Sequence, residues 1–262
     1  MLSTDYVPGA PNWIDLGVPD TDAAVAFYGA VFGWEFQSAG PDSGGYGFLR
    51  SGGRAVAGVG PLTEEGASPS WTVYFHTTDA DATAQAVEQA GGRVRFGPYD
   101  VFTAGRLAGF TDPAGAEFGV WQPRDTRGME VVNDPNTLSW TELYSTDAAA
   151  AKEFYRSVFS WRTRDMPMGE GLDYAVASPA GGGEHSGHAG ILQLPQEHRD
   201  RGSTSEWHPY FEVTDCDAVF ATATDHGATM LIPPMDARGI GRMAMMRDPA
   251  GAQLAVIKGD RD

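Results

Sequence analysis

The chain has 262 residues, of which 42% are hydrophobic, a length and composition that suggest two packed domains. Its formal net charge of −17 argues against nucleic acid and anionic membrane surfaces as partners. No apolar run is long enough to span a membrane, and the first residues lack the basic and apolar regions of a secretory signal. We therefore expect a cytoplasmic protein.

The single cysteine, Cys216, leaves no partner for an intrachain disulfide and excludes a thiolate zinc site. It stands between two aspartates, whose charge disfavours the reactive thiolate. We interpret Cys216 as a small residue at the start of a helix.

The first predicted element is a strand over residues 13–18, in which Ile14, Leu16 and Val18 share one face. A helix follows, capped by Asp20 or Thr21, with apolar residues at the spacing of one helical face. It ends near Trp34, and short strands separated by glycine-rich turns come next.

This pattern of strand, helix and about three strands recurs at residues 71, 140 and 207. Residues 13–34 and 140–161 match without a gap, and the motif Asp-Pro-Ala-Gly occurs near the end of each half. Repetition of this kind determines the architecture. We predict an α+β protein of four repeated units, with its domain boundary in the polar segment PRDTRGMEVVNDPN.

The motifs AFYGAVFGW, EFYRSVFSW and the two DPAG sequences make the chain resemble the vicinal oxygen chelate superfamily. Its members include glyoxalases, bleomycin-resistance proteins and extradiol dioxygenases. The resemblance covers nearly the whole chain and implies four βαβββ modules that form two glyoxalase-like domains with cupped mixed sheets. We expect these domains at residues 11–124 and 137–258.

The resemblance also implies where the enzymes of the superfamily place their metal ligands. In this sequence those positions hold Trp13, Thr72, Gly119, Trp140, His208 and Ala255. A divalent ion needs three or four His, Glu or Asp ligands, and only His208 qualifies. We therefore predict no metal and no other cofactor. The alternative is a transition-metal site that includes His208, or His188 from the loop pair His185 and His188.

Strand alternation places a second set of side chains on the face opposite the helices. Aromatic walls and a few polar groups of this kind suit a small organic ligand. The predicted binding residues are Trp13, Tyr74, Trp121, Trp140 and Tyr210, with Arg106 and Arg242 for an anionic group. The predicted acid or base residues are Asp15, His76, Glu142, His208 and Glu212, and Glu117 and Tyr144 share the same face.

Each assignment has a structural alternative. Asp15 and Glu142 fit equally well at a wet rim or in ion pairs with Arg106 and Arg242, and the two arginines fit structural salt bridges. Trp13 and Trp140 have enough bulk to fill the cups. Trp34 and Trp161, which close helices, are assigned to the core.

We predict that the protein binds a small aromatic or polycyclic molecule, either natural-product-like or a carbonyl compound, and the sequence leaves open whether it also transforms this molecule without a metal. The alternatives are a metal-dependent lyase, isomerase or dioxygenase, and a tandem domain that docks a macromolecule. The sequence leaves open which modules share a cup and whether the chain is a monomer or a homodimer.

Overall fold

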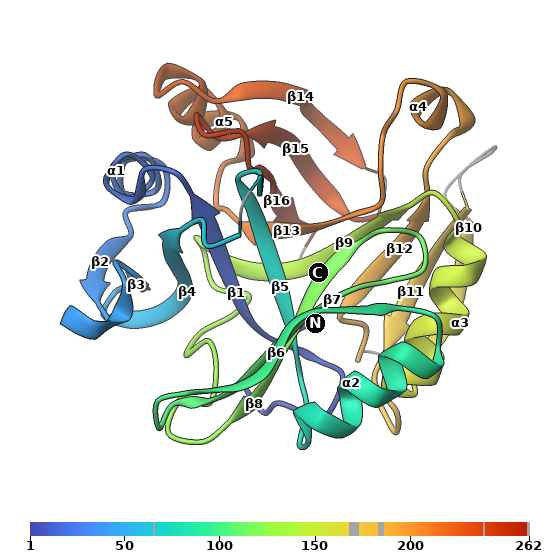
Figure 1. Cartoon of the computed structure of the whole chain (residues 1–262). Helices are drawn as coiled ribbons and strands as arrows, with labels where there is room; N and C mark the ends of the chain where they lie inside the picture. The colour runs from blue at the N-terminus through green and yellow to red at the C-terminus, as the bar shows by residue number, and fades with distance from the viewer. Residues whose placement is uncertain (65, 168–172, 183–185, 238, 261–262) are drawn as a thin grey trace. The chain divides into compact units, whose positions relative to one another are not determined.

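The computed structural model describes residues 1–260 except 65, 168–172, 183–185 and 238. A strand, a helix and three further strands follow one another four times along the chain (Figure 1). This confirms the predicted α+β architecture of four modules.

The strands form two eight-stranded mixed sheets, each with strands from two consecutive modules. The order in the first is β2 (Glu35–Ser38), β3 (Gly47–Ser51), β4 (Arg54–Pro61), β1 (Pro11–Val18), β5 (Ser70–His76), β8 (Glu117–Pro123), β7 (Gly105–Thr111), β6 (Arg93–Val101). The order in the second is β10 (Arg162–Pro167), β11 (Asp173–Ser178), β12 (Ala189–Gln193), β9 (Thr137–Ser145), β13 (Glu206–Glu212), β16 (Gln253–Gly259), β15 (Gly241–Arg247), β14 (Thr229–Ala237). In each module the first strand is parallel to the last, and the hairpins are antiparallel.

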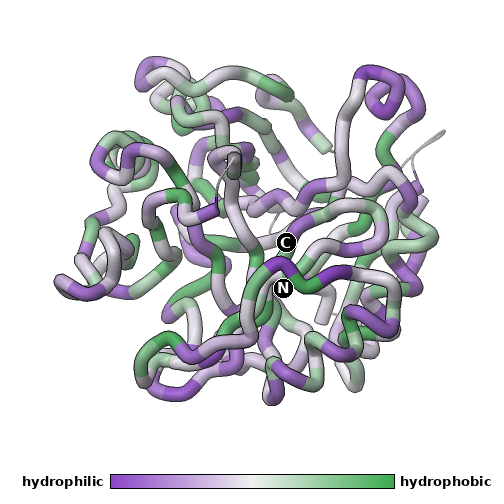
Figure 2. The backbone as a smooth tube through the Cα atoms, in the orientation of Figure 1, coloured by the Kyte–Doolittle hydropathy of each residue, from purple (hydrophilic) through white to green (hydrophobic). Residues whose placement is uncertain are grey.

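One helix follows the first strand of each module, and an aspartate caps its start through a backbone amide three residues on. These helices are α1 (Thr21–Phe32), α2 (Ala80–Gln89), α3 (Ala148–Phe159) and α5 (Cys216–Asp225). The connections carry a short 3-10 turn, η1 (Pro41–Ser43), and α4 (Gln196–Asp200), which is hydrophilic throughout (Figure 2). No helix among the described residues has the length and apolar character to cross a membrane.

The chain folds into two compact units that do not follow the two halves of the sequence. Unit one contains residues 1–13, 73–128 and 140–208, and unit two contains residues 14–72, 129–139 and 209–262. In unit one α2 lies beside α3 (Figure 1), and in unit two α1 packs against α5. Each unit thus combines modules from both halves of the chain.

The core of unit one is built around a buried chain of hydrogen bonds. Trp207 Nε1 donates to the Tyr155 hydroxyl at 2.8 Å, and that hydroxyl donates to Asp112 Oδ2 at 3.2 Å. Asp112 Oδ1 accepts the backbone amides of Ala114 and Ala116, which shapes the turn between β7 and β8. Burial raises the pKa of Asp112 even with these donors.

Unit two repeats the arrangement with the other copy of each motif. Trp71 Nε1 donates to the Tyr28 hydroxyl at 3.1 Å, and Tyr28 donates to Asp248 Oδ2 at 3.0 Å. Trp34 and Trp161 stack on Tyr28 and Tyr155, respectively, with 3% and 1% of their surfaces exposed. The repeated motifs therefore build the cores, as predicted.

Candidate functional site

A second hydrogen-bonded cluster lies on strands β9 and β11 of unit one. Tyr174 donates its hydroxyl proton to the carboxylate of Glu142, and the Trp140 indole N–H donates to the same phenol oxygen. Burial, followed by the charge of Glu142, raises the pKa of Tyr174 far above its ordinary value. Tyr174 therefore stays protonated and is a fixed donor to a carboxylate that is only 8% exposed.

One glycine makes room for this cluster. Gly190 on β12 pairs in register with Glu142, and a methyl group at Gly190 would overlap the Tyr174 hydroxyl and meet Glu142 Oε1 at 2.8 Å. The Trp140 ring also lies near Gly187, where a methyl group would meet it at an ordinary contact distance of 3.5 Å. The contact between phenol and carboxylate therefore requires the small residue at position 190.

His208 extends the site onto β13. Its ring lies 4.6 Å from the ring of Tyr144, and 2% of its surface is exposed. Neither ring nitrogen has a hydrogen-bond partner among the described residues, and Nε2 lies 3.6 Å from Glu206 Oε2, too far for a hydrogen bond. His208 thus offers a buried imidazole beside the aromatic residues of this site.

The residues at the superfamily's ligand positions do not fit a divalent ion. Gly119 pairs with Tyr74, whose ring fills the space that a side chain at position 119 would need. Ala255 pairs with Tyr210, which is buried. No three His, Cys, Asp or Glu side chains converge as a metal site within the described part of the chain.

Three other predicted residues of unit one lie in separate surroundings, and of these Glu117 is exposed. His76 donates to the carbonyl of Val7 and is covered by the N-terminal segment, and burial lowers its pKa. Trp121 donates its indole N–H to the Thr126 carbonyl at 2.8 Å. Glu117, on the same strand as Trp121, forms an ion pair with Arg95 at 2.8 Å.

The remaining predicted residues lie on β1 or at the far end of β13 from His208. Trp13 on β1 is 7% exposed, and Asp15 on the same strand is half-buried. Glu212 on β13 is 8% exposed, and its carboxylate lies beside Gly259. Of the predicted acid or base residues, Glu142 and His208 lie in the site of β9, β11 and β13.

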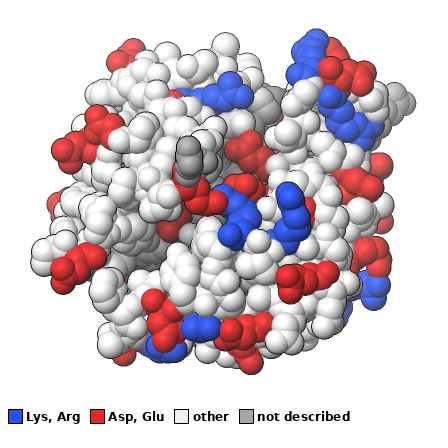
Figure 3. Space-filling model, viewed as in Figure 1, with Lys and Arg blue, Asp and Glu red and all other residues white. Residues whose placement is uncertain are grey.

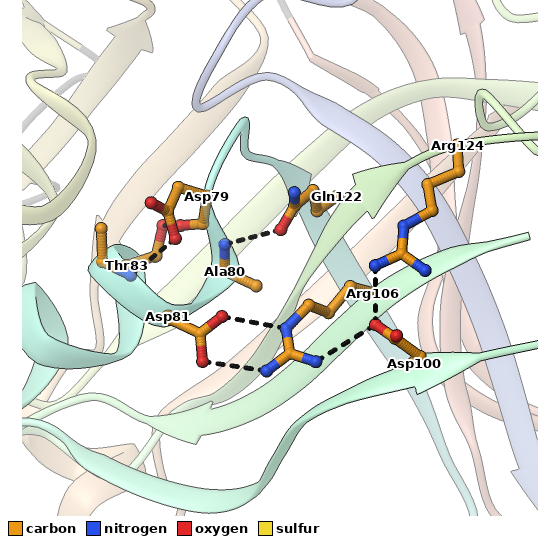
Figure 4. Close-up of polar contacts among 9 residues, drawn as sticks. Asp79, Ala80, Asp81, Thr83, Asp100, Arg106, Gln122 and Arg124 are labelled. Atoms are coloured by element: carbon orange, nitrogen blue, oxygen red, sulfur yellow. Dashed lines mark hydrogen bonds and ion pairs between the residues drawn. The ribbon is translucent and has the colours of Figure 1, made fainter. Parts of the chain in front are cut away.

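Arg106 and Arg242 hold structural ion pairs. Arg106 forms a bidentate ion pair with Asp81 on α2, in which Nε donates to Oδ2 at 3.0 Å and Nη2 donates to Oδ1 at 2.9 Å (Figure 4). Arg106 also donates to Asp100, which accepts a second hydrogen bond from Arg124. Arg242 repeats this with Asp217 and Asp236. These pairs favour the structural alternative over an anion site, and Figure 3 shows basic side chains beside acidic ones on the visible face.

His188 lines a cavity of about 250 Å³ between the N-terminal segment and the loop before β12. Its ring packs edge-on against Trp161 and is 2% exposed. Burial, followed by the charge of the N-terminal amine, lowers its pKa to about 3, so that it is neutral. His185, the other histidine of the predicted pair, lies outside the described residues.

Tyr174 is the functional candidate that sequence reasoning missed. It lies near the start of a short strand that the sequence marks only weakly, because glycines and charged residues precede it. Its counterpart in the first half is Tyr46, but the distance from the preceding tryptophan differs by one residue between the copies. An alignment of the third strands of the two modules, allowing that insertion, would have revealed the pair.

Comparison with known proteins agrees with this fold. The Glyoxalase/Bleomycin resistance protein/Dioxygenase superfamily matches residues 10–120, and the Glyoxalase-like domain matches residues 140–257. The glyoxylase-like protein CFP32 of Mycobacterium tuberculosis is 35% identical, with 97% of each chain covered. The anthracycline biosynthesis protein DnrV of Streptomyces peucetius is 35% identical, over 97% of this chain and 95% of its own.

Two solved structures share the fold at lower identity. The 2,3-dioxygenase LapB from Pseudomonas sp. KL28 has a TM-score of 0.65 at 13% identity, covering 96% of this chain and 93% of its own. The Mn(II)-bound glyoxalase from Novosphingobium aromaticivorans has a TM-score of 0.61 at 19% identity, covering 97% and 86%. From the family match and the relatives at 35% identity, we conclude that this chain belongs to the glyoxalase/bleomycin resistance protein/dioxygenase superfamily.

Proposed function

We propose that the protein binds a small aromatic or polycyclic molecule at Trp140, Glu142, Tyr174 and His208, without a divalent metal. The observation that carries this proposal is the buried Glu142 carboxylate, held by a phenol and surrounded by aromatic rings. An aromatic ligand with a hydroxyl or amine can donate to Glu142 while its ring packs against Trp140 and Tyr144. A relative named for anthracycline biosynthesis supports a polycyclic ligand.

Titration of a panel of aromatic and polycyclic compounds against tryptophan fluorescence tests the binding. We expect at least one hydroxylated member to quench the emission, and Glu142→Gln to weaken its binding by about tenfold or more, the value of a charge-assisted hydrogen bond. Glu88→Gln, at an exposed position on α2, should bind like the wild type. Equal affinity in both variants would contradict the assignment of Glu142.

A second candidate function is proton transfer on a carbonyl compound. Glu142 would remove a proton from the carbon next to the carbonyl, giving an enolate, while Tyr174 keeps the carboxylate oriented. Glu142→Gln should then abolish turnover and leave the thermal unfolding midpoint near that of the wild type. Unchanged turnover would remove Glu142 from the chemistry and leave a binding protein.

Metal content is tested separately. Elemental analysis of protein purified without an affinity tag should find well below one equivalent of any divalent ion, and chelator should not weaken ligand binding. One equivalent of metal, with binding lost on chelation, would contradict the metal-free part of the proposal. It would favour the metal-dependent alternative.

A further inference from the structure

Unit two contains a second copy of the phenol and glycine arrangement. The Tyr46 hydroxyl lies directly over Gly58 on β4, and a methyl group at Gly58 would overlap it. Tyr174 stands over Gly190 in the same manner in unit one. In both copies, therefore, a tyrosine hydroxyl lies over a glycine of the last strand of the module, β4 or β12.

The strand register brings a carboxylate to each of these glycines. Asp15 pairs with Gly58, and Glu142 pairs with Gly190, both in the parallel arrangement. The repeat thus places an acidic residue, a glycine and a phenol together twice, once in each unit. Phe48, which pairs with Gly58, packs edge-on against Tyr46 at 6.0 Å and supplies an aromatic wall.

The two copies of the arrangement differ in the length of the acidic side chain and in the residue beneath the tyrosine ring. Asp15 is one methylene shorter than Glu142. The Tyr46 ring also lies close to Gly60, with a carbon 2.9 Å from the position of a methyl group there, whereas Tyr174 pairs with Leu192. Asp15 is half-buried, whereas Glu142 is 8% exposed, so the carboxylate of the first copy is the more accessible of the two.

We propose that Asp15, Tyr46, Phe48 and Gly58 form a second binding site for the same ligand class, so that each chain binds two molecules with unequal affinity. This proposal rests on the function proposed for the site at Glu142. The ligand is a neutral or cationic aromatic molecule with a hydroxyl or amine donor, because a carboxylate in a chain of net charge −17 repels anions. The shorter and more exposed carboxylate of Asp15 makes this the site for the bulkier ring system.

Isothermal titration with β-naphthol, a neutral aromatic donor, tests the stoichiometry. We expect two molecules per wild-type chain and one in each of Gly58→Ala and Gly190→Ala, where the added methyl group displaces a single tyrosine hydroxyl. The methyl ether of β-naphthol keeps the ring but cannot donate, so it should bind about tenfold more weakly at both sites. Circular dichroism melting checks that both variants fold.

Tyr46→Phe and Tyr174→Phe replace the glycine variants if either of those fails to fold, and each should weaken one of the two sites. One molecule per wild-type chain, lost in Gly190→Ala and retained in Gly58→Ala, would overturn the second site and leave the function at Glu142 standing. No heat of binding in the wild type, with β-naphthol or its ether, would overturn both proposals.

Discussion

Tyr174 shows how one side chain fixes the chemistry of its neighbours. Its hydroxyl accepts from Trp140 and donates to Glu142, so the oxygen of a single residue orients an indole and a carboxylate. The raised pKa of Tyr174 keeps its proton in place across the physiological range. Charge on the site therefore resides on Glu142, which is the group that a donor on the ligand would meet.

His188 makes stability depend on pH. Above the ordinary pKa of 6.5, His188 is neutral in both the folded and the unfolded chain, so protonation of this residue takes nothing from the free energy of unfolding. As the pH falls from 6.5 toward the folded value of about 3, only the unfolded chain takes up the proton, so stability is lost. Since each unit of pH in this window costs about 1.4 kcal/mol, we expect a loss of about 3 kcal/mol from this group by about pH 4.5.

Urea unfolding of His188→Phe at neutral pH and at about pH 4.5 measures this contribution. The variant should lose about 3 kcal/mol less than the wild type on acidification, because phenylalanine does not titrate. His198→Phe makes the same chemical change at an exposed position on α4. This control should lose as much stability between neutral pH and about pH 4.5 as the wild type does. Identical pH dependence in His188→Phe and the wild type would rule out His188 as the source.

At the scale of elements, the hydrogen-bonded chains join a helix to a turn between strands. Tyr155 of α3 links Trp207 at the start of β13 to Asp112 in the turn after β7. Tyr155→Phe leaves Asp112 Oδ2 and Trp207 Nε1 buried without that partner, so we expect the free energy of unfolding to fall by about 2 to 4 kcal/mol. Chemical denaturation measures the change.

Tyr28→Phe breaks the equivalent chain in unit two and should cost a similar amount. Tyr99→Phe is the control, because Tyr99 is 48% exposed and an exposed hydroxyl usually contributes little. A loss below about 0.5 kcal/mol in Tyr155→Phe would show that the chain of hydrogen bonds adds nothing to the packing of the rings.

The sequence predicted the secondary-structure elements better than it predicted which side chains contact one another. Periodicity identified the four modules, and the buried positions of Ile14, Leu16 and Val18 agree with the alternation. It did not predict that Tyr155 meets Asp112, because contacts between distant segments depend on packing rather than on local pattern. For the same reason the site was predicted only in part: alternation placed Trp140 and Glu142 on one face of β9, but Tyr174 reaches them from β11, on the far side of β12.

At the scale of the whole molecule, each unit takes segments from both halves of the chain. The Tyr155 that meets Asp112 and the Asp248 that meets Tyr28 both lie beyond residue 137, where the second predicted domain begins. Residues 1–128 expressed alone would therefore expose Phe75 and Phe118, which pack against Tyr155 in unit one. Because each unit needs segments from both halves, we expect that the predicted domains, 11–124 and 137–258, do not fold independently.

We expect residues 1–128 and 129–262, expressed separately, to be poorly folded or aggregated, because each half exposes apolar surface that the other half covers in the compact units. Co-expressed, the halves should associate into a soluble complex with a melting transition close to that of the intact chain. Circular dichroism and sedimentation velocity on the separate and combined fragments measure this. A cooperative transition at the intact chain's temperature in residues 1–128 alone would show that the first predicted domain is a folding unit, and that the contacts of Asp112 with the second half are dispensable.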